Sequence, residues 1–274
     1  MKPLVSIIMG IYNCAETLPE SIDSILAQSF SDWELILCDD GSADSTYAVA
    51  QRYAEKYPER IRLLKNEKNL GLNLTLNRCL REARGAFIAR QDGDDLSLPH
   101  RLQTEVDFLE AHPEYAFVSS AMIHFDETGD WGRDRVIEAP EKKDFVAKNP
   151  FFHAPCMVRR EAYELAGGYD TGTLFLRKED YHLWCKMYAK GLRGYNLSEP
   201  LYKMRDDMNA ISRRTLWYRI VGVAAEFRCY QILKLPLRYY LMIPRSLMIG
   251  LLPTPLYQKL HKKKHEKIDA GEQP

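Results

Sequence analysis

Three carboxylates stand within four residues of the sequence, at Asp92, Asp94 and Asp95, with Gly93 between the first two. Like charges at this spacing repel one another, so the cluster is costly unless a cation lies among them. Carboxylate oxygens are the ligands that Mg²⁺ and Mn²⁺ prefer, and such an ion typically shares its coordination shell with a diphosphate. The sequence therefore predicts a divalent metal site, with an ordinary Asp-Gly-Asp turn as the alternative.

An apolar run places these acids in the fold. Residues 86–90 have the composition of a short buried strand, and the acids follow at its carboxyl end. In open α/β sheets, ligands bind at this edge. A helix is expected to begin soon afterwards, at Pro99. This position strengthens the prediction of a metal site.

Strand-like and helix-like segments alternate along the first hundred residues. Apolar β-rich runs occupy 4–9, 33–38 and 61–64, and helical periodicity fills 15–28, 49–57 and 72–84. Short β-α-β spacing calls for a mostly parallel sheet with helices on both faces. We expect an α/β, Rossmann-like fold with a nucleotide-binding half at 1–98.

The second half of the domain is expected at 99–215, on the acceptor side. Its predicted elements are helices near 99–109, 161–166 and 180–191, and strands at 115–121 and 151–158. The stretch 125–144 is polar and rich in turn residues, so we expect a variable loop there.

Composition sets limits on the class of protein. The 274 residues are 46% hydrophobic and carry 38 basic and 38 acidic side chains, which argues against a nucleic-acid binder. Six scattered cysteines form no C-x-x-C pair, so neither zinc nor a redox pair is indicated and a reducing, cytoplasmic compartment fits best. We expect neither a signal peptide nor a transmembrane helix.

Six short blocks, in order along the chain, together resemble family 2 glycosyltransferases. They are Val5-Ser6-Ile7-Ile8-Met9-Gly10-Ile11-Tyr12-Asn13, Asp39-Asp40-Gly41-Ser42-Ala43-Asp44-Ser45, Asn69-Leu70-Gly71-Leu72, Ile88 to Leu102, Gly167-Gly168-Tyr169-Asp170, and Glu179-Asp180-Tyr181-His182-Leu183-Trp184. The resemblance covers about residues 4–215. It implies a GT-A fold, a nucleotide-sugar donor, Mn²⁺ or Mg²⁺, and inversion at the anomeric carbon.

The resemblance also implies donor-side roles, one position at a time. Tyr12 falls where the family stacks on the nucleobase, and Asp40 where a carboxylate accepts the base imide proton, which favours uracil and hence a UDP-sugar. Asp92 matches a position near the ribose and the metal, and Asp94 matches the direct metal ligand. Arg90 is expected at the diphosphate or sugar, or as a partner of Asp92. The neighbouring Asp39 is expected to hold its turn through backbone N–H groups.

On the acceptor side, Asp180 falls where the family places its catalytic base. Inversion needs one carboxylate to take the proton of the attacking hydroxyl. The competitor for this role is Glu179, which could instead bind donor or acceptor hydroxyls. The resemblance places His153 near the acceptor-side loop, although a lone histidine is more often structural.

Two sequence patterns that are absent from the chain bear on the acceptor and on the reaction class. Residues 202–214 have no Q-x-x-R-W block, which favours transfer of a single sugar to a glycan or lipid-linked hydroxyl over polymerisation. A sugar nucleotidyltransferase is the first alternative, but the loop at 10–14 lacks the Gly-rich, basic pattern of that class. An inactive scaffold of a membrane assembly is the second, and retention of the acids argues against it.

Residues 216–274 differ from the rest of the chain. The segment 217–260 is apolar and aromatic, with Lys234, Arg238 and Arg245 on one side of a helical wheel. A basic run follows at Lys259, Lys262, Lys263, Lys264 and Lys267. We expect a helical appendage that either packs on the domain or anchors the protein peripherally to the anionic inner face of a membrane.

Overall fold

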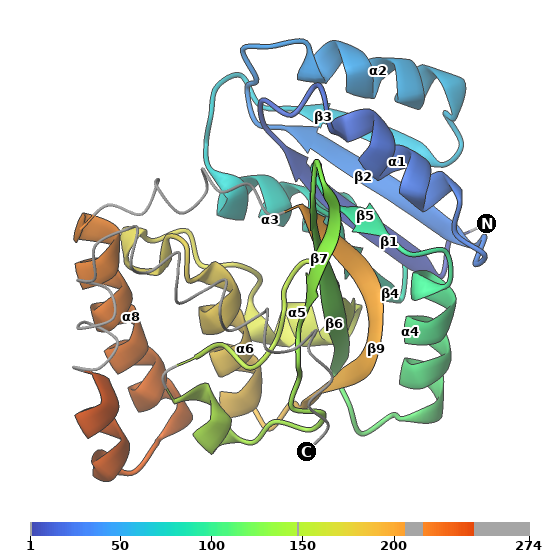
Figure 1. Ribbon diagram of the computed structural model, residues 1–274. Coiled ribbons are helices and arrows are strands. Elements are labelled where there is room, and N and C mark those ends of the chain that lie inside the picture. The colour runs from blue at the N-terminus through green and yellow to red at the C-terminus, as the bar shows by residue number, and fades with distance from the viewer. Residues whose placement is uncertain (1, 147, 206–215, 244–274) are drawn as a thin grey trace.

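The computed structural model describes residues 2–146, 148–205 and 216–243 (Figure 1). In these ranges the strands are β1 (Val5–Ile11), β2 (Trp33–Asp39), β3 (Ile61–Lys65), β4 (Phe87–Arg90), β5 (Leu96–Ser97), β6 (Phe117–Asp126), β7 (Gly129–Arg133), β8 (Met157–Arg159) and β9 (Gly194–Arg205). The α-helices are α1 (Leu18–Leu26), α2 (Thr46–Lys56), α3 (Leu72–Glu82), α4 (Arg101–Ala111), α5 (Arg160–Ala166), α6 (Glu179–Ala189) and α8 (Leu216–Leu233). Short 3-10 turns lie at η1 (Lys142–Phe145), η2 (Thr173–Phe175) and η3 (Leu237–Met242).

A single mixed sheet runs through the described residues in the order β3-β2-β1-β4-β8-β6-β9-β5, with β7 paired to β6. The first four strands of this order are parallel to one another, as the β-α-β spacing predicts. The side chains of successive residues in β1 point to opposite faces of the sheet, as they do along any strand. Ile7 belongs to the core cluster that includes residues of α1, α2 and α4, whereas Ile8 belongs to the cluster that includes residues of α3, α5 and α6. The predicted α/β architecture with helices on both faces is confirmed (Figure 1).

The segment 125–144 is a loop only in part, at residues 134–141. Strand β6 continues to Asp126, turns and pairs with β7, and a 3-10 turn follows at Lys142–Phe145. The extension of β6 is stabilised by β9, since Phe125 lies beside Arg205 in the sheet. Pairing between residues so far apart in the chain overrides weak local propensity, and so the local pattern could not reveal it.

The strand expected at 151–158 is also shorter, since only Met157–Arg159 joins the sheet as β8. The carbonyl oxygens of Ala154 and Cys156 are instead turned toward the buried guanidinium of Arg101, 3.3 Å from its Nη2. A buried carbonyl needs a donor. Arg101 supplies one to Ala154, and the carbonyl of Cys156 also accepts the backbone N–H of Arg90 at the end of β4, at 3.0 Å.

The described part of the C-terminal appendage packs on the domain. Ala225, Cys229 and Tyr230 of α8 are fully buried in the same core cluster as Trp184 of α6. Helix α8 ends at Leu233, and Lys234 has a positive φ of 55°, so Lys234 and Arg238 do not continue one helical wheel. Arg245 and the basic run from Lys259 lie outside the described residues. No described helix has both the length and the apolar character to cross a membrane.

Candidate active site

The candidate site lies at the carboxyl ends of β1, β2 and β4. In the register of the sheet, Ile11 lies beside Asp39 and Ile8 beside Arg90, so the loops after these strands emerge at one edge. Tyr12, the first residue after β1, has a side chain that is 48% exposed and available for stacking. The fold thus brings three predicted donor-side segments together.

The two adjacent acids after β2 have different surroundings. Asp40 is buried, and its carboxylate accepts hydrogen bonds from Asn66 Nδ2 at 2.7 Å and from the backbone N–H groups of Leu70 and Gly71 at 2.9 Å. Asp40 therefore holds the loop before α3, and its contact with a nucleobase stays a prediction.

Unlike Asp40, Asp39 has one carboxylate oxygen without a hydrogen-bond partner in the described part of the chain. Its Oδ2 accepts from the backbone N–H of Ser42 at 3.3 Å, as predicted for a turn-holding residue. Its Oδ1 is buried and has no hydrogen-bond partner among the described residues. An unpartnered buried carboxylate oxygen is costly, and Asp39 Oδ1 is therefore an acceptor that still lacks a hydrogen bond from the described residues.

Arg90 and Asp92 form a two-pronged ion pair beside this edge. Arg90 Nε donates to Asp92 Oδ1 at 2.9 Å, and Nη2 donates to Asp92 Oδ2 at 3.0 Å. Such forked pairs fix the orientation of both groups. Because Arg90 is only 6% exposed, its head lies beneath the site surface, and both oxygens of Asp92 are already engaged.

His153 holds the other side of the Arg90 guanidinium. Its Nδ1 accepts a hydrogen bond from Arg90, and its Nε2 lies 2.7 Å from the hydroxyl of Tyr169. Burial lowers the pKa of His153 well below its usual range, and Arg90 adds to this effect, so the ring is neutral. His153 is thus an interior support of Arg90. These contacts match the structural alternative, and its acceptor-side role stays a prediction.

The remaining acids of the cluster divide into one exposed and one buried group. Asp94 has an exposed side chain, whereas Asp95 is buried and accepts a hydrogen bond from the backbone N–H of Arg205 at 2.8 Å. Desolvation by neighbouring protein atoms raises the pKa of Asp94, and the negative charge of Asp92 adds to this rise. Helix α1 secures the turn, since Thr17 donates to the carbonyl of Gly93 at 3.0 Å.

This donor set fits a metal that shares its shell with substrate. No group of three or more acidic, histidine or cysteine side chains in the described ranges forms a cage. Mg²⁺-type sites are commonly built from one or two carboxylates together with phosphate and water oxygens. Asp94 supplies an outward-facing carboxylate of that kind, with Asp92 adjacent but held by Arg90.

Glu179 and Asp180 are the first two residues of α6. Asp180 Oδ2 accepts from Asn149 Nδ2 at 2.7 Å, and Oδ1 accepts from the N–H of Tyr181 at 2.7 Å. Burial raises the pKa of Asp180, while the Tyr181 N–H, Arg90 and other donors oppose that rise. Burial and Asp180 likewise raise the pKa of Glu179. The Arg90 guanidinium opposes the rise in the pKa of both carboxylates.

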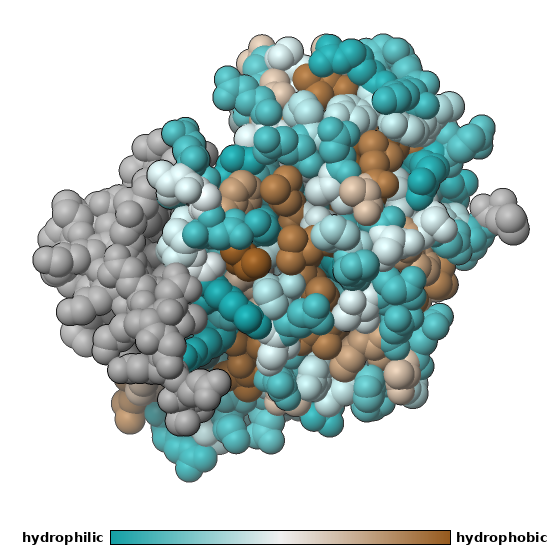
Figure 2. Space-filling view, turned by 45° about the vertical axis from the view of Figure 1, so that its right-hand side comes forward, coloured by the Kyte–Doolittle hydropathy of each residue, from teal (hydrophilic) through white to brown (hydrophobic). Residues whose placement is uncertain are grey.

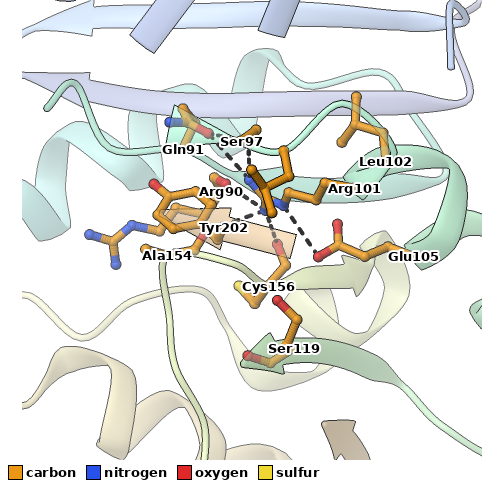
Figure 3. A network of polar contacts seen from close by, with 12 residues as sticks. Arg90, Gln91, Ser97, Arg101, Leu102, Glu105, Ser119, Ala154, Cys156 and Tyr202 are labelled. Atoms are coloured by element: carbon orange, nitrogen blue, oxygen red, sulfur yellow. Dashed lines mark hydrogen bonds and ion pairs between the residues drawn. The ribbon is translucent and has the colours of Figure 1, made fainter. Parts of the chain in front are cut away.

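The sequence did not predict a functional role for Arg101, whose side chain is the centre of a buried hydrogen-bond network (Figure 3). The side chain of Arg101 is fully buried, and its Nη2 donates to the carbonyl of Arg90 at 2.8 Å. Its Nη1 donates to Ser97 Oγ at 2.9 Å, and its Nε lies 3.3 Å from Glu105 Oε1. Arg101 fixes the end of β4 and hence the start of the acidic turn. The only local signal was its place in the block Pro99-His100-Arg101-Leu102.

We predict that Arg101→Met lowers the free energy of unfolding by about 3 kcal/mol or more, because it leaves a buried carboxyl and several carbonyls without their donor. Glu105→Gln is the matched control and should cost less, since burial already raises the pKa of Glu105 to about 7. Urea unfolding at neutral pH measures both. Equal, small losses for the two variants would contradict the role assigned to Arg101.

Comparison with known proteins shows the family to which the chain belongs. The model of the family "Glycosyl transferase family 2" matches residues 6–179. A Bacillus subtilis (strain 168) protein that carries the name glycosyltransferase EpsE is 45% identical over 96% of this chain and 94% of its own length. The Escherichia coli UDP-Glc:alpha-D-GlcNAc-diphosphoundecaprenol beta-1,3-glucosyltransferase WfaP is 26% identical over 82% of this chain and 89% of its own.

A solved structure shares the fold. The mannosyltransferase PcManGT from Pyrobaculum calidifontis, in complex with GDP-Man and Mn²⁺, superposes with a TM-score of 0.61 at 21% identity, covering 100% of this chain and 77% of that one. The α/β, GT-A-type architecture is confirmed by this likeness. Given the family match and the EpsE identity, the chain belongs to the family 2 glycosyltransferases, enzymes that act on nucleotide sugars.

Proposed function

We propose that this protein is a metal-dependent, inverting glycosyltransferase that moves one sugar from a UDP-sugar to a hydroxyl of a glycan or lipid-linked acceptor. The observation that carries the proposal is the separation of two kinds of carboxylate. Asp94 is exposed beside the paired Asp92, whereas Asp180 is held by two N–H donors at the start of α6. One group suits a cation and the other suits a base.

The reaction follows from these positions. The acceptor hydroxyl gives its proton to the carboxylate of Asp180 while its oxygen forms the bond to the anomeric carbon. The bond from that carbon to the diphosphate breaks on the opposite side, which inverts the configuration. Asn149 and the Tyr181 N–H orient the base and favour its ionised form. A bound Mn²⁺ or Mg²⁺, held by Asp94, would neutralise the charge of the leaving diphosphate.

On the donor side, Tyr12 stacks on the base and Arg90 orients Asp92 toward the ribose and diphosphate. WfaP, which is named for UDP-glucose, supports a UDP-sugar donor, and the Mn²⁺ complex of PcManGT supports a divalent metal. A screen of UDP- and GDP-sugars with Mn²⁺, followed by NMR of the product, tests the proposal. A product that retains the donor configuration would refute inversion, and an absence of transfer from every donor would favour the inactive scaffold.

The unpartnered oxygen of Asp39 yields a prediction about the base. We propose that Asp39 Oδ1 accepts the imide N–H of uracil. Asp39→Asn should weaken UDP binding by about tenfold, the scale of one lost hydrogen bond to a charged group. Calorimetry with UDP measures this loss, and Asp40→Asn serves as the comparison. A larger loss of UDP affinity in a folded Asp40→Asn protein would return the role to Asp40.

We also propose that the protein acts peripherally at the cytoplasmic face of a membrane, through residues beyond Ile243. The lipid-linked acceptor in the name of WfaP and the basic run from Lys259 support this. Hydrophobic residues on the face in Figure 2 form small patches between polar ones, which points away from a broad apolar surface in that view.

Removal of residues 244–274 should abolish flotation with anionic vesicles and leave the described core intact, because Leu233 and Leu235 stay in place. Vesicles of neutral lipid are the control for the electrostatic contribution. Equal flotation of the full-length and shortened proteins would contradict the anchor.

A further inference from the structure

Residues 167–170, one of the blocks that resemble the family, form a tight turn after α5. Gly167 has a left-handed backbone with a φ of 73°, and Gly168 follows with a φ of 65°. A Cβ on Gly168 would lie 2.7 Å from Oδ1 of Asn77 on α3, so a larger residue does not fit there without a shift. The two glycines therefore let the chain pass close to α3 directly before Tyr169.

Helix α3 fixes the backbone of this turn. Asn77 Oδ1 accepts from the backbone N–H of Tyr169 at 2.9 Å, and Asn77 Nδ2 donates to the carbonyl of Tyr169 at 2.8 Å. Asn73, one helical turn earlier, donates to the carbonyl of Asp170 at 2.7 Å. Both backbone polar groups of Tyr169 are thus bound to one helix, and its side chain starts from a fixed position.

The hydroxyl of Tyr169 belongs to a buried chain of hydrogen bonds that ends at the acidic turn. The Tyr169 side chain lies in the core, with its hydroxyl 2.7 Å from His153 Nε2 and 3.0 Å from the hydroxyl of Tyr163 on α5. On its other side His153 Nδ1 accepts from Arg90, whose Nε and Nη2 donate to the two oxygens of Asp92. The turn after α5 is therefore connected to Asp92 through two intervening side chains.

The chemistry of these groups sets the direction of the chain. A guanidinium can only donate hydrogen bonds, so the His153 Nδ1 that faces Arg90 must be the nitrogen without a proton. The ring then carries its proton on Nε2, which donates to the hydroxyl oxygen of Tyr169. The Tyr169 hydroxyl keeps its own proton for Tyr163. An acceptor at Tyr169 thus favours the one tautomer of His153 that can accept from Arg90.

We infer that Tyr169 is a positioning residue for the donor, which holds His153 in the Nε2-protonated tautomer and through it fixes the Arg90–Asp92 pair at the acidic turn. The inference rests on the proposed function, because it takes that turn as the site of the donor diphosphate. Tyr169 does not need to touch a substrate for this role. It gives residues 167–170 a task on the donor side.

Tyr169→Phe tests the role because it removes only the acceptor of His153. Mn²⁺-dependent UDP binding should weaken about fivefold, the scale of one hydrogen bond, as the Arg90–Asp92 pair loses its fixed place. Tyr163→Phe is the matched control, since it removes a buried hydroxyl from the same chain but leaves Tyr169 to accept from His153. It should lower Tm to a similar extent and keep the UDP affinity of the wild type. Calorimetry with UDP and Mn²⁺, beside thermal unfolding, measures both quantities.

The tautomer itself can be observed by NMR of ¹⁵N-labelled histidine, with His153 assigned by its absence from His153→Gln. In the wild-type protein Nδ1 should have the shift of an unprotonated nitrogen and Nε2 that of a protonated one, and Tyr169→Phe should lose this single pattern. In a His153→Leu background, Tyr169→Phe should cause no further loss of UDP affinity, because it acts through His153.

Several results would overturn the inference. They are a proton on His153 Nδ1 in the wild-type protein, an unchanged UDP affinity in Tyr169→Phe, an equal loss of affinity in Tyr163→Phe, or a full additional loss in the His153→Leu background. Unchanged Mn²⁺-dependent UDP binding in both Asp92→Asn and Asp94→Asn would overturn the proposed donor site and this inference together. A loss in those two variants beside a normal Tyr169→Phe would overturn this inference alone.

Discussion

Asp180→Asn is expected to lose on the order of 10²-fold or more in single-turnover transfer, the scale of general-base effects. The substitution keeps the shape of the side chain and its place in the first turn of α6, and it removes only the basicity. UDP affinity should survive, because the carboxylate of Asp180 accepts hydrogen bonds from Asn149 and Tyr181 and the proposed nucleotide contacts come from other residues. Rapid-quench transfer and calorimetry with UDP measure the two quantities separately.

Glu179→Gln is the matched control for this prediction. Glu179 neighbours Asp180 and has its pKa raised by burial in the same way, so a general effect of charge loss at this end of α6 would affect both variants. An inactive Glu179→Gln beside a near-normal Asp180→Asn would move the base by one residue. Normal turnover in both would refute a carboxylate base on α6.

Asp94→Asn is expected to abolish the Mn²⁺-dependent part of UDP binding while leaving the fold intact. The reason is that Asp94 presents an exposed carboxylate at the acidic turn, whereas Asp95 is buried and binds Arg205. An amide is neutral and a far weaker ligand for Mn²⁺ or Mg²⁺ than a carboxylate. Calorimetric titration of UDP with and without Mn²⁺ measures the loss.

Asp92→Asn is the comparison variant that tests which of the two acids is the principal metal ligand. Both oxygens of Asp92 already accept hydrogen bonds from Arg90, so its substitution should loosen Arg90 and weaken UDP binding less than Asp94→Asn does. If Asp94→Asn keeps its full UDP affinity in the presence of Mn²⁺, the metal site proposed at Asp94 is refuted. A greater loss in Asp92→Asn would make Asp92 the principal ligand.

The sequence determined those features that depend on local pattern. Alternating apolar runs and helical periodicity predicted the parallel half of the sheet, and the family blocks predicted which loops carry the acids. The acids at 92–95 are found where the end of a strand predicted them. These features are readable because strand burial, helix faces and turn residues each depend on neighbours a few positions away.

Tertiary structure alone decided how identical residue types divide their work. Asp39 and Asp40 are adjacent carboxylates, but side chains at a strand end point to opposite sides, so one ties down the loop before α3 and the other keeps an unpartnered oxygen. His153 turns inward to Arg90, a partner 63 residues away. Arg101 donates hydrogen bonds to the carbonyls of Arg90, Ala154 and Cys156. Lys178 donates to Glu226, which lies 48 residues away in the sequence. Such contacts are set by which elements the sheet brings together. Apart from Arg101 with Arg90, these partners are 31 or more residues apart, so no window of local sequence contains both.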